Sequence, residues 1–143
     1  MENRQAAYLT RMRYAHAKEL SRLGLFTAAS GEDGVLLCLY AHRDPLLSGD
    51  VTDKTGLTSG RVANILKQLE KKQLIQRLQD AEDKRRIHVR LTSRGRTQAE
   101  ALIQSLHGQY SGLLSYLGER DGSELIRLLD RCLLYARESM PGG

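Results

Sequence analysis

The chain has 143 residues, enough for one domain with its own hydrophobic core and no need of a disulfide or metal for stability. Hydrophobic residues make up 41% and charged residues 27%, which excludes a disordered chain. No apolar run approaches the ~18 residues of a membrane span, and no signal-peptide pattern is present at the start. Two prolines and abundant leucine indicate a mostly helical protein. Cys38 and Cys132 form no CxxC pair and no disulfide framework, so we expect a reducing cytoplasm. Because no apolar run is long enough to span a membrane, we expect no membrane partner.

The positive charge is concentrated in the centre of the sequence. Between Arg61 and Arg96 there are eleven Lys or Arg and four Asp or Glu, a net charge of +7, whereas the remainder carries −2. A basic block between neutral or acidic ends indicates a module that binds a polyanion. The alternative is a solvated cationic face, and the pattern inside the block has to decide between them.

The first half of the chain has the hydrophobic period of helices. One is predicted from the N-terminus to Gly24, because apolar residues recur at steps of three and four. Another spans about 32–42, with a cap at Ser30 and a break at residues 43–45. A short helix is predicted over 46–55, and Gly56 is suited to a left-handed turn. Thr58 then caps a helix with one apolar and one polar, basic side.

In the second half of the basic block, apolar residues recur at every second position instead of at steps of three and four. Segments 74–78 and 87–91 have the pattern of strands, and the charged loop 79–86 joins them into a β-hairpin on which His88 points outward. Thr92 and Ser93 cap a long helix that ends at Gly118. A capping box of Asp121 and Glu124 is expected to start the last helix, which places Cys132 on an apolar stripe.

The order of helix, helix–turn–helix and β-hairpin is that of a winged helix. An α-helix, about 10–12 Å wide, fits the ~12 Å major groove of duplex DNA. A basic hairpin beside it reaches the minor groove, where A·T-rich stretches concentrate negative potential. The fold class we expect is therefore mainly α with a small β-hairpin wing, a winged helix-turn-helix flanked by N- and C-terminal helices.

Two segments resemble the MarR family of bacterial transcription regulators: residues 57–77 (LTSGRVANILKQLEKKQLIQR) and residues 80–95 (DAEDKRRIHVRLTSRG). The sequence motifs of the family match over about residues 46–95. The flanking helices match the family only in their order along the chain. The wing pattern, Asp-x-Arg followed by a strand, Leu-Thr and then Gly, is fairly specific. Gln73 stands where glycine is common, and Lys84 where arginine is commoner.

The resemblance implies roles for particular residues. The major groove would be contacted by Thr58, Ser59, Arg61, Asn64 and Lys67. Arg85 would enter the minor groove, and Asp83 would orient the arginines. Arg77, Lys84 and Arg86 would lie at phosphates. The alternatives are an ordinary solvated face on the helix, and an Arg85 that pairs with Asp83 and nothing else.

The resemblance also implies a homodimer within a single MarR-like domain, 1–143. The winged helix part would be 32–96, and segments 1–24 and 97–139 would be the dimerisation helices. Their stripes could instead pack only within one chain. A dimer would bind a palindromic operator, because half-sites one turn apart require a two-fold partner. The function implied is a sequence-specific repressor of a bacterial cytoplasm, released by a small, aromatic effector.

The effector pocket is the least specified part of this interpretation. Its candidate residues are Tyr14, His16, Tyr40 and His42, which are alternatively core or surface residues. A regulator that senses oxidants through a cysteine is a second hypothesis, although Cys38 lies in an apolar helix that favours an inert thiol. We expect no metal site, because the four histidines form no HxxxH pair.

Other classes of protein are less well supported. A single-stranded nucleic-acid binder needs exposed aromatic residues, and the basic block has none. An enzyme is not expected, because GxSxG, HExxH, GxGxxG and GxxxxGK[ST] are all missing. The acids of the basic block lie in a charged loop or on a helix surface and show no sign of a pair perturbed by burial. We therefore predict no catalytic residue and no cofactor. A non-specific architectural DNA-binding protein remains an alternative.

Overall fold

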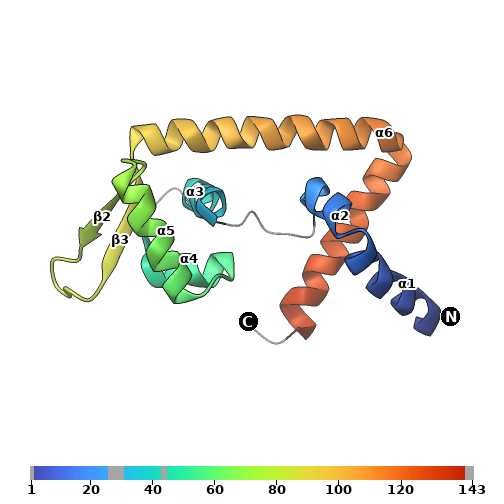
Figure 1. The fold of residues 1–143 in the computed structure, drawn as a ribbon, viewed down its shortest axis with the longest axis horizontal. Helices are drawn as coiled ribbons and strands as arrows, with labels where there is room; N and C mark the ends of the chain where they lie inside the picture. The colour runs from blue at the N-terminus through green and yellow to red at the C-terminus, as the bar shows by residue number, and fades with distance from the viewer. Residues whose placement is uncertain (1, 26–30, 43–44, 141–143) are drawn as a thin grey trace. The chain divides into compact units, whose positions relative to one another are not determined.

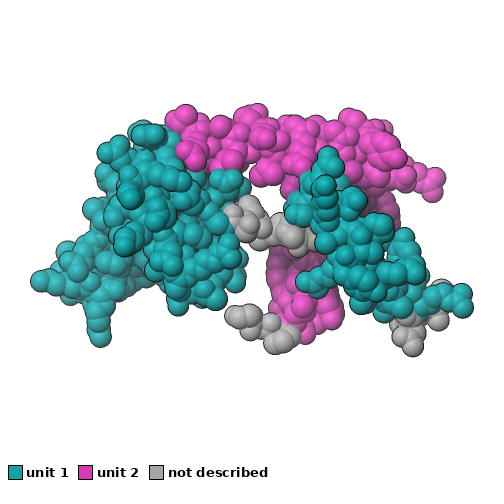
Figure 2. All heavy atoms as spheres, in the orientation of Figure 1, with its two compact units in different colours: residues 1–95 teal, residues 96–143 magenta. Residues whose placement is uncertain are grey.

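The computed structural model describes residues 2–25, 31–42 and 45–140, and it divides into two compact units, 1–95 and 96–143 (Figure 2). The elements are α1 (Glu2–Ala15), α2 (Ala17–Leu23), α3 (Gly31–Ala41), β1 (Leu46–Leu47), α4 (Ser48–Thr55), α5 (Ser59–Lys71), β2 (Ile75–Gln79), β3 (Ile87–Leu91) and α6 (Ser93–Ser139). All of them except β1 are labelled in Figure 1. The predicted cap at Ser30 and the break at 43–44 lie outside the described residues. None of the helices in the described ranges combines the length and hydrophobicity needed to cross a bilayer.

The N-terminal segment is two helices, so the prediction of one continuous helix is wrong. His16 leaves the helical region with φ −123° and ψ 33°, and α2 begins at the next residue. Side chains around His16 are exposed, so no packing enforces a continuous rod there. Gly24, in contrast, ends α2 as predicted, in a left-handed conformation with φ 68°.

The winged helix part is built on one hydrophobic core. Helices α3, α4 and α5 contact one another, and α3 and α4 also contact β3 (Figure 1). The core side chains of this part are Val35, Leu36, Leu39, Val51, Val62, Ile65, Leu66, Leu69, Leu74, Ile75 and Val89. The predicted fold class, mainly helical with a β-hairpin wing, is confirmed.

The wing contains a third strand that the sequence did not reveal. The sequence predicts residues 46–47 as the start of a helix, but they form β1, which pairs antiparallel with β3 at Leu46↔Val89 and Leu47↔His88. The strand order is β1-β3-β2. Two residues are too few to show the alternating hydrophobic pattern of a strand. Pairing with the edge of β3 fixes their extended conformation. Helix α4 starts only at Ser48, where the Asp50 carboxylate accepts a hydrogen bond from the Leu47 N–H at 3.1 Å.

The junction between the wing and α6 explains the Leu-Thr-x-x-Gly pattern. The Thr92 hydroxyl donates to the Gln73 carbonyl oxygen at 2.7 Å and accepts from the Gly95 N–H at 3.0 Å, so it caps α6 and ties it to the end of α5. A Cβ on Gly95 would lie 1.9 Å from the carbonyl oxygen of Leu74, which leaves room only for glycine. Gln73 itself adopts a positive φ of 63°.

Helix α6 is interrupted where the sequence predicted its end. Gly118 has φ 84° and ψ 169°, which are not helical values. The helix resumes directly after it, so the predicted capping box at Asp121 is wrong, since Asp121 lies inside the second segment. Glu124 instead forms an ion pair with Arg127, three residues further along the same helix.

Candidate nucleic-acid interface

Helix α5 presents one basic, exposed side to solvent. The Thr58 hydroxyl caps the helix as predicted by accepting a hydrogen bond from the Arg61 N–H at 3.2 Å. Four residues of the opposite side, Val62, Ile65, Leu66 and Leu69, are buried. Arg61, Asn64 and Lys67 follow at steps of three, so they share the exposed side. This side can therefore enter a groove without disturbing the core.

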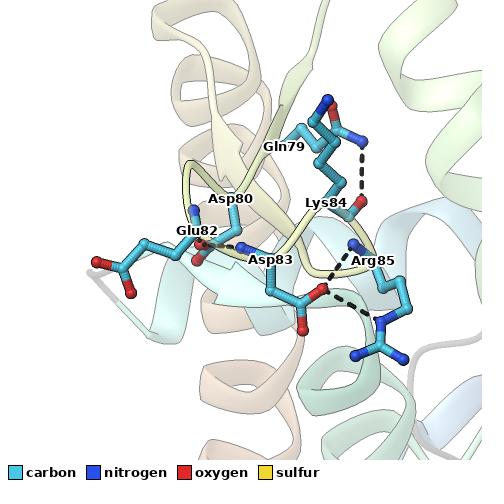
Figure 3. Close-up of polar contacts among 6 residues, drawn as sticks. All are labelled: Gln79, Asp80, Glu82, Asp83, Lys84 and Arg85. Atoms are coloured by element: carbon cyan, nitrogen blue, oxygen red, sulfur yellow. Dashed lines mark hydrogen bonds and ion pairs between the residues drawn. The ribbon is translucent and has the colours of Figure 1, made fainter.

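The wing loop carries an exposed arginine held by a neighbouring carboxylate. Asp83 Oδ1 accepts from the backbone N–H of Arg85 at 3.0 Å and from its guanidinium Nε at 3.3 Å (Figure 3). The Arg85 side chain is 91% exposed despite this pair. Lys84 and Arg86, on either side, are exposed too. The loop thus concentrates three cations at its tip, with one of them oriented.

A second carboxylate, which the sequence did not single out, organises the base of the same loop. Asp80 Oδ1 accepts from the N–H groups of Glu82 and Asp83 at 2.8 and 3.1 Å (Figure 3), and Oδ2 contacts His88 Nε2 at 2.8 Å. The hydrogen bond with His88 lowers the pKa of the Asp80 carboxyl most, and the two backbone bonds add to this effect. Together they hold that pKa well below its usual range. His88 is therefore engaged with Asp80 rather than simply pointing outward, and the lowered pKa of Asp80 comes from hydrogen bonds rather than from burial.

The remaining cations differ in whether an acid neutralises them. Arg77 donates to Glu70 at 2.8 Å, and this bond raises the pKa of the arginine and lowers that of the glutamate. Lys72 pairs with Glu32 at 2.6 Å, which joins α5 to α3. The cations that form no ion pair with any other described residue include Arg61, Lys67, Lys84 and Arg86. All nine residues predicted to contact DNA are exposed.

The predicted effector residues lie in different surroundings. Tyr14 is 72% exposed on α1, and His16 is exposed at the break after it. Tyr40 and His42 are half-buried at the end of α3, and the His42 ring bonds the Cys38 carbonyl oxygen at 2.8 Å. The role of the four residues in binding an effector stays a prediction.

The two cysteines have different environments. Cys38 is half-buried, and burial raises the pKa of its thiol, which disfavours the reactive thiolate. The sequence places Cys132 on an apolar stripe, but its side chain is exposed. Within the described residues there is no group of three or more His, Cys, Asp or Glu that could hold a metal ion.

A helix–turn–helix with a basic exposed second helix, followed by a hairpin with an arginine at its tip, defines the class of winged helix DNA-binding proteins.

Comparison with known proteins narrows this class. Residues 34–87 match the model of the MarR family. Two structures of MepR from Staphylococcus aureus, one a mutant and one a MepR–DNA complex, are similar to this chain. The mutant is 32% identical over 89% of this chain and 95% of its own, with a TM-score of 0.66. The DNA complex is 31% identical, over 90% and 95%, with a TM-score of 0.66.

The chain therefore belongs to the MarR family and is a DNA-binding transcription regulator. YdgJ of Bacillus subtilis (strain 168), described as an HTH-type transcriptional regulator, is 32% identical over 96 residues. That match spans 67% of this chain and 58% of YdgJ. The regulator SlyA shares the fold, with 20% identity and a TM-score of 0.67 over 94% of this chain and 90% of its own.

Proposed function

We propose that this protein is a homodimeric repressor that binds a palindromic duplex operator through α5 and the wing. The observation that carries the proposal is the row of exposed cations that lack an acidic partner within the described residues, opposite a buried apolar side. Phosphates supply the charge that such a surface lacks. One of the similar MepR structures is a complex of that protein with DNA, which supports the same kind of partner here.

Each element would have a separate task on the duplex. Thr58, Ser59, Arg61, Asn64 and Lys67 are proposed to contact base edges and phosphates in the major groove. Arg85 is proposed to enter the minor groove, oriented by Asp83. Arg77, Lys84 and Arg86 are proposed to contact phosphates. This division follows from shape, because the major groove admits a helix and a narrow minor groove attracts arginine.

Homodimerisation is proposed through segments 1–24 and 97–139, outside the winged helix part 32–96 of a single domain. Helix α1 leaves Tyr8, Leu9 and Tyr14 exposed, by 55%, 63% and 72%. The second segment of α6 leaves five large apolar residues exposed: Ile126, Leu128, Leu133, Leu134 and Tyr135. Apolar groups this numerous on a helix favour burial against a partner, and a second copy supplies the two-fold axis that a palindrome requires.

Release by a small aromatic effector, bound near Tyr14, His16, Tyr40 and His42, completes the proposal. We place the protein in a bacterial cytoplasm. The non-specific architectural alternative predicts equal affinity for unrelated duplexes, and the redox alternative predicts oxidation-dependent release that Cys38→Ser or Cys132→Ser abolishes. Neither has an observation that favours it over the repressor.

The experiment that tests the proposal is equilibrium binding to fluorescent duplex DNA. The probe is a duplex that the wild-type protein selects from a random-sequence pool. Arg85→Ala should weaken binding at least tenfold, and Lys67→Ala should reduce the salt slope by about 0.9, the contribution of one phosphate contact. Asp33→Asn, an exposed position on α3 outside the proposed interface and the dimerisation segments, is the control and should bind like the wild type. Wild-type affinity in both Arg85→Ala and Lys67→Ala would refute the interface.

A further inference from the structure

The wing loop between β2 and β3, residues 80–86, is folded around one carboxylate. Asp80 uses Oδ1 for two backbone N–H groups of the loop and Oδ2 for His88 on β3. The loop is also closed by backbone bonds from Asp80 N to Arg86 O at 2.9 Å and from Arg86 N to Asp83 O at 3.0 Å. The side chain of Asp80 is only 20% exposed. Gln79, the last residue of β2, adds a further bond from its Nε2 to the Lys84 carbonyl oxygen at 2.8 Å (Figure 3). Asp80 is therefore the side chain that makes the most bonds between the loop and the sheet.

The contacts of Asp80 continue to the tip of the loop. The N–H of Asp83 is bonded to Asp80, while the carboxylate of Asp83 is bonded to Arg85. The chain of contacts therefore runs from His88 through Asp80 and Asp83 to the guanidinium of Arg85. We propose that Asp80 and His88 are positioning residues for Arg85, which hold the wing loop in the conformation that presents this arginine to the minor groove. This inference rests on the proposed function, because it assumes that Arg85 contacts DNA.

The position of Arg85 makes such support necessary. Its side chain is 91% exposed, and its ion pair within the described residues is with Asp83. An exposed loop of this length samples many conformations unless internal bonds restrict them, and each lost restraint has to be recovered on binding. Three donors on the Asp80 carboxylate restrain this loop, beside the single bond from the Gln79 side chain to Lys84. Their loss should lower affinity for DNA without removing any group that touches it.

Electrostatics alone predicts that removal of Asp80 raises affinity for DNA, whereas loss of positioning lowers it. The sign of the change in affinity therefore tests the inference. Removal of an acid beside a polyanion-binding surface removes repulsion and raises affinity. Glu82 is an exposed acid in the same loop whose carboxylate has no hydrogen bond with any other described residue. Asp80→Ala and Glu82→Ala thus remove the same charge from the same loop, but only the first removes the loop's support.

The experiment measures the affinity of the full-length variants for the duplex selected by the wild type. We expect Glu82→Ala to bind as tightly as the wild type or up to about threefold more tightly. Asp80→Ala should bind about five- to tenfold more weakly. Asp80→Asn, which keeps an oxygen for the two backbone N–H groups, should lie between them. His88→Gln, which keeps an N–H donor, should bind more tightly than His88→Leu. If Asp80→Ala does not fold, Asp80→Asn and the His88 pair provide the same comparison.

A double-mutant cycle separates positioning from a general structural effect. In an Arg85→Ala background, the effect of Asp80→Ala should shrink to less than about threefold, because most of it passes through Arg85 and only the remainder through Lys84 and Arg86 on the same loop. In a Lys67→Ala background, its full effect should persist. Wild-type affinity in Asp80→Ala, or an undiminished effect in the Arg85→Ala background, would overturn the inference. If Arg85→Ala itself binds like the wild type, the proposed role of the wing is wrong as well, so the two failures are distinguishable.

Discussion

Arg77 on β2 donates a hydrogen bond to Glu70 on α5 across 2.8 Å, and the two residues join helix α5 to the wing. The same arginine is proposed to contact a DNA phosphate. The glutamate therefore has two opposing effects: it orients the guanidinium and it neutralises it. Both side chains are partly exposed, so neither effect is enlarged by burial.

Glu70→Gln tests which effect is larger. We expect operator affinity to rise about two- to fivefold, because the change frees the charge of Arg77 and removes repulsion at the DNA surface. The measurement is a binding titration at two salt concentrations, where the affinity gain should be larger at low salt. The control is Asp33→Asn, which removes an exposed carboxylate from α3 outside the proposed interface and the dimerisation segments, and should have no effect. A fall in the affinity of Glu70→Gln would show that orientation of Arg77 matters more.

Gln73→Gly should stabilise the protein. Gln73 has φ 63°, a left-handed conformation that is sterically costly for glutamine because of its Cβ and carries no steric cost for glycine. We expect a gain of about 0.5–1 kcal/mol in the free energy of unfolding, measured with urea. Gln68→Gly, in the interior of α5, is the matched control and should destabilise by about 1 kcal/mol. Equal effects of the two variants would contradict the left-handed conformation of Gln73.

Gly95→Ala should be among the most damaging single-methyl substitutions in this chain. The added Cβ would lie 1.9 Å from the Leu74 carbonyl oxygen, a backbone atom that can move only with β2. We expect a loss of about 3 kcal/mol or more, or failure to fold. Gly60→Ala adds the same methyl group to an exposed helix position with no atom within 4 Å, and should be neutral or stabilising. Similar unfolding midpoints for the two variants would refute the close approach.

The stability contributed by Asp80 should depend on pH in a defined direction. Its carboxyl pKa is lowered in the folded protein, so its contribution is complete above the ordinary value of about 3.9 and declines as the pH falls towards the lowered one. Asp80→Asn should therefore unfold at lower urea than the wild type at neutral pH, and the gap should narrow below about pH 4. With Glu82→Gln the gap should be small at every pH. A constant gap for Asp80→Asn down to about pH 2 would contradict the lowered pKa.

The features that the sequence predicted well are local ones. The cap at Thr58, the helix end at Gly24, the left-handed Gly56 and the interruption at Gly118 all depend on a few neighbouring residues, so residue type is enough to place them. The buried side of α5 followed from its 3.6-residue period. Recognition of the winged helix needed only the order of these elements.

The features that were missed depend on pairing between distant segments. Strand β1 forms because it pairs with the edge of β3. The two residues 46–47 alone are too short to show the alternating pattern of a strand. The Asp80–His88 contact depends on the register of the hairpin, Leu78↔His88, which places Asp80 two residues further along the same face. A loop of this length does not fix the register. An aspartate just after a strand is, however, a known turn former, and that signal could have drawn attention to Asp80.

The most direct test of the proposed function is selection of duplex DNA from a random-sequence pool by the wild-type protein, followed by sequencing. A homodimer that contacts adjacent major grooves with α5 should enrich a palindrome whose half-sites are about 10–10.5 bp apart. Recovery of unrelated sequences, with equal affinity for each, would contradict the proposal that this protein recognises an operator.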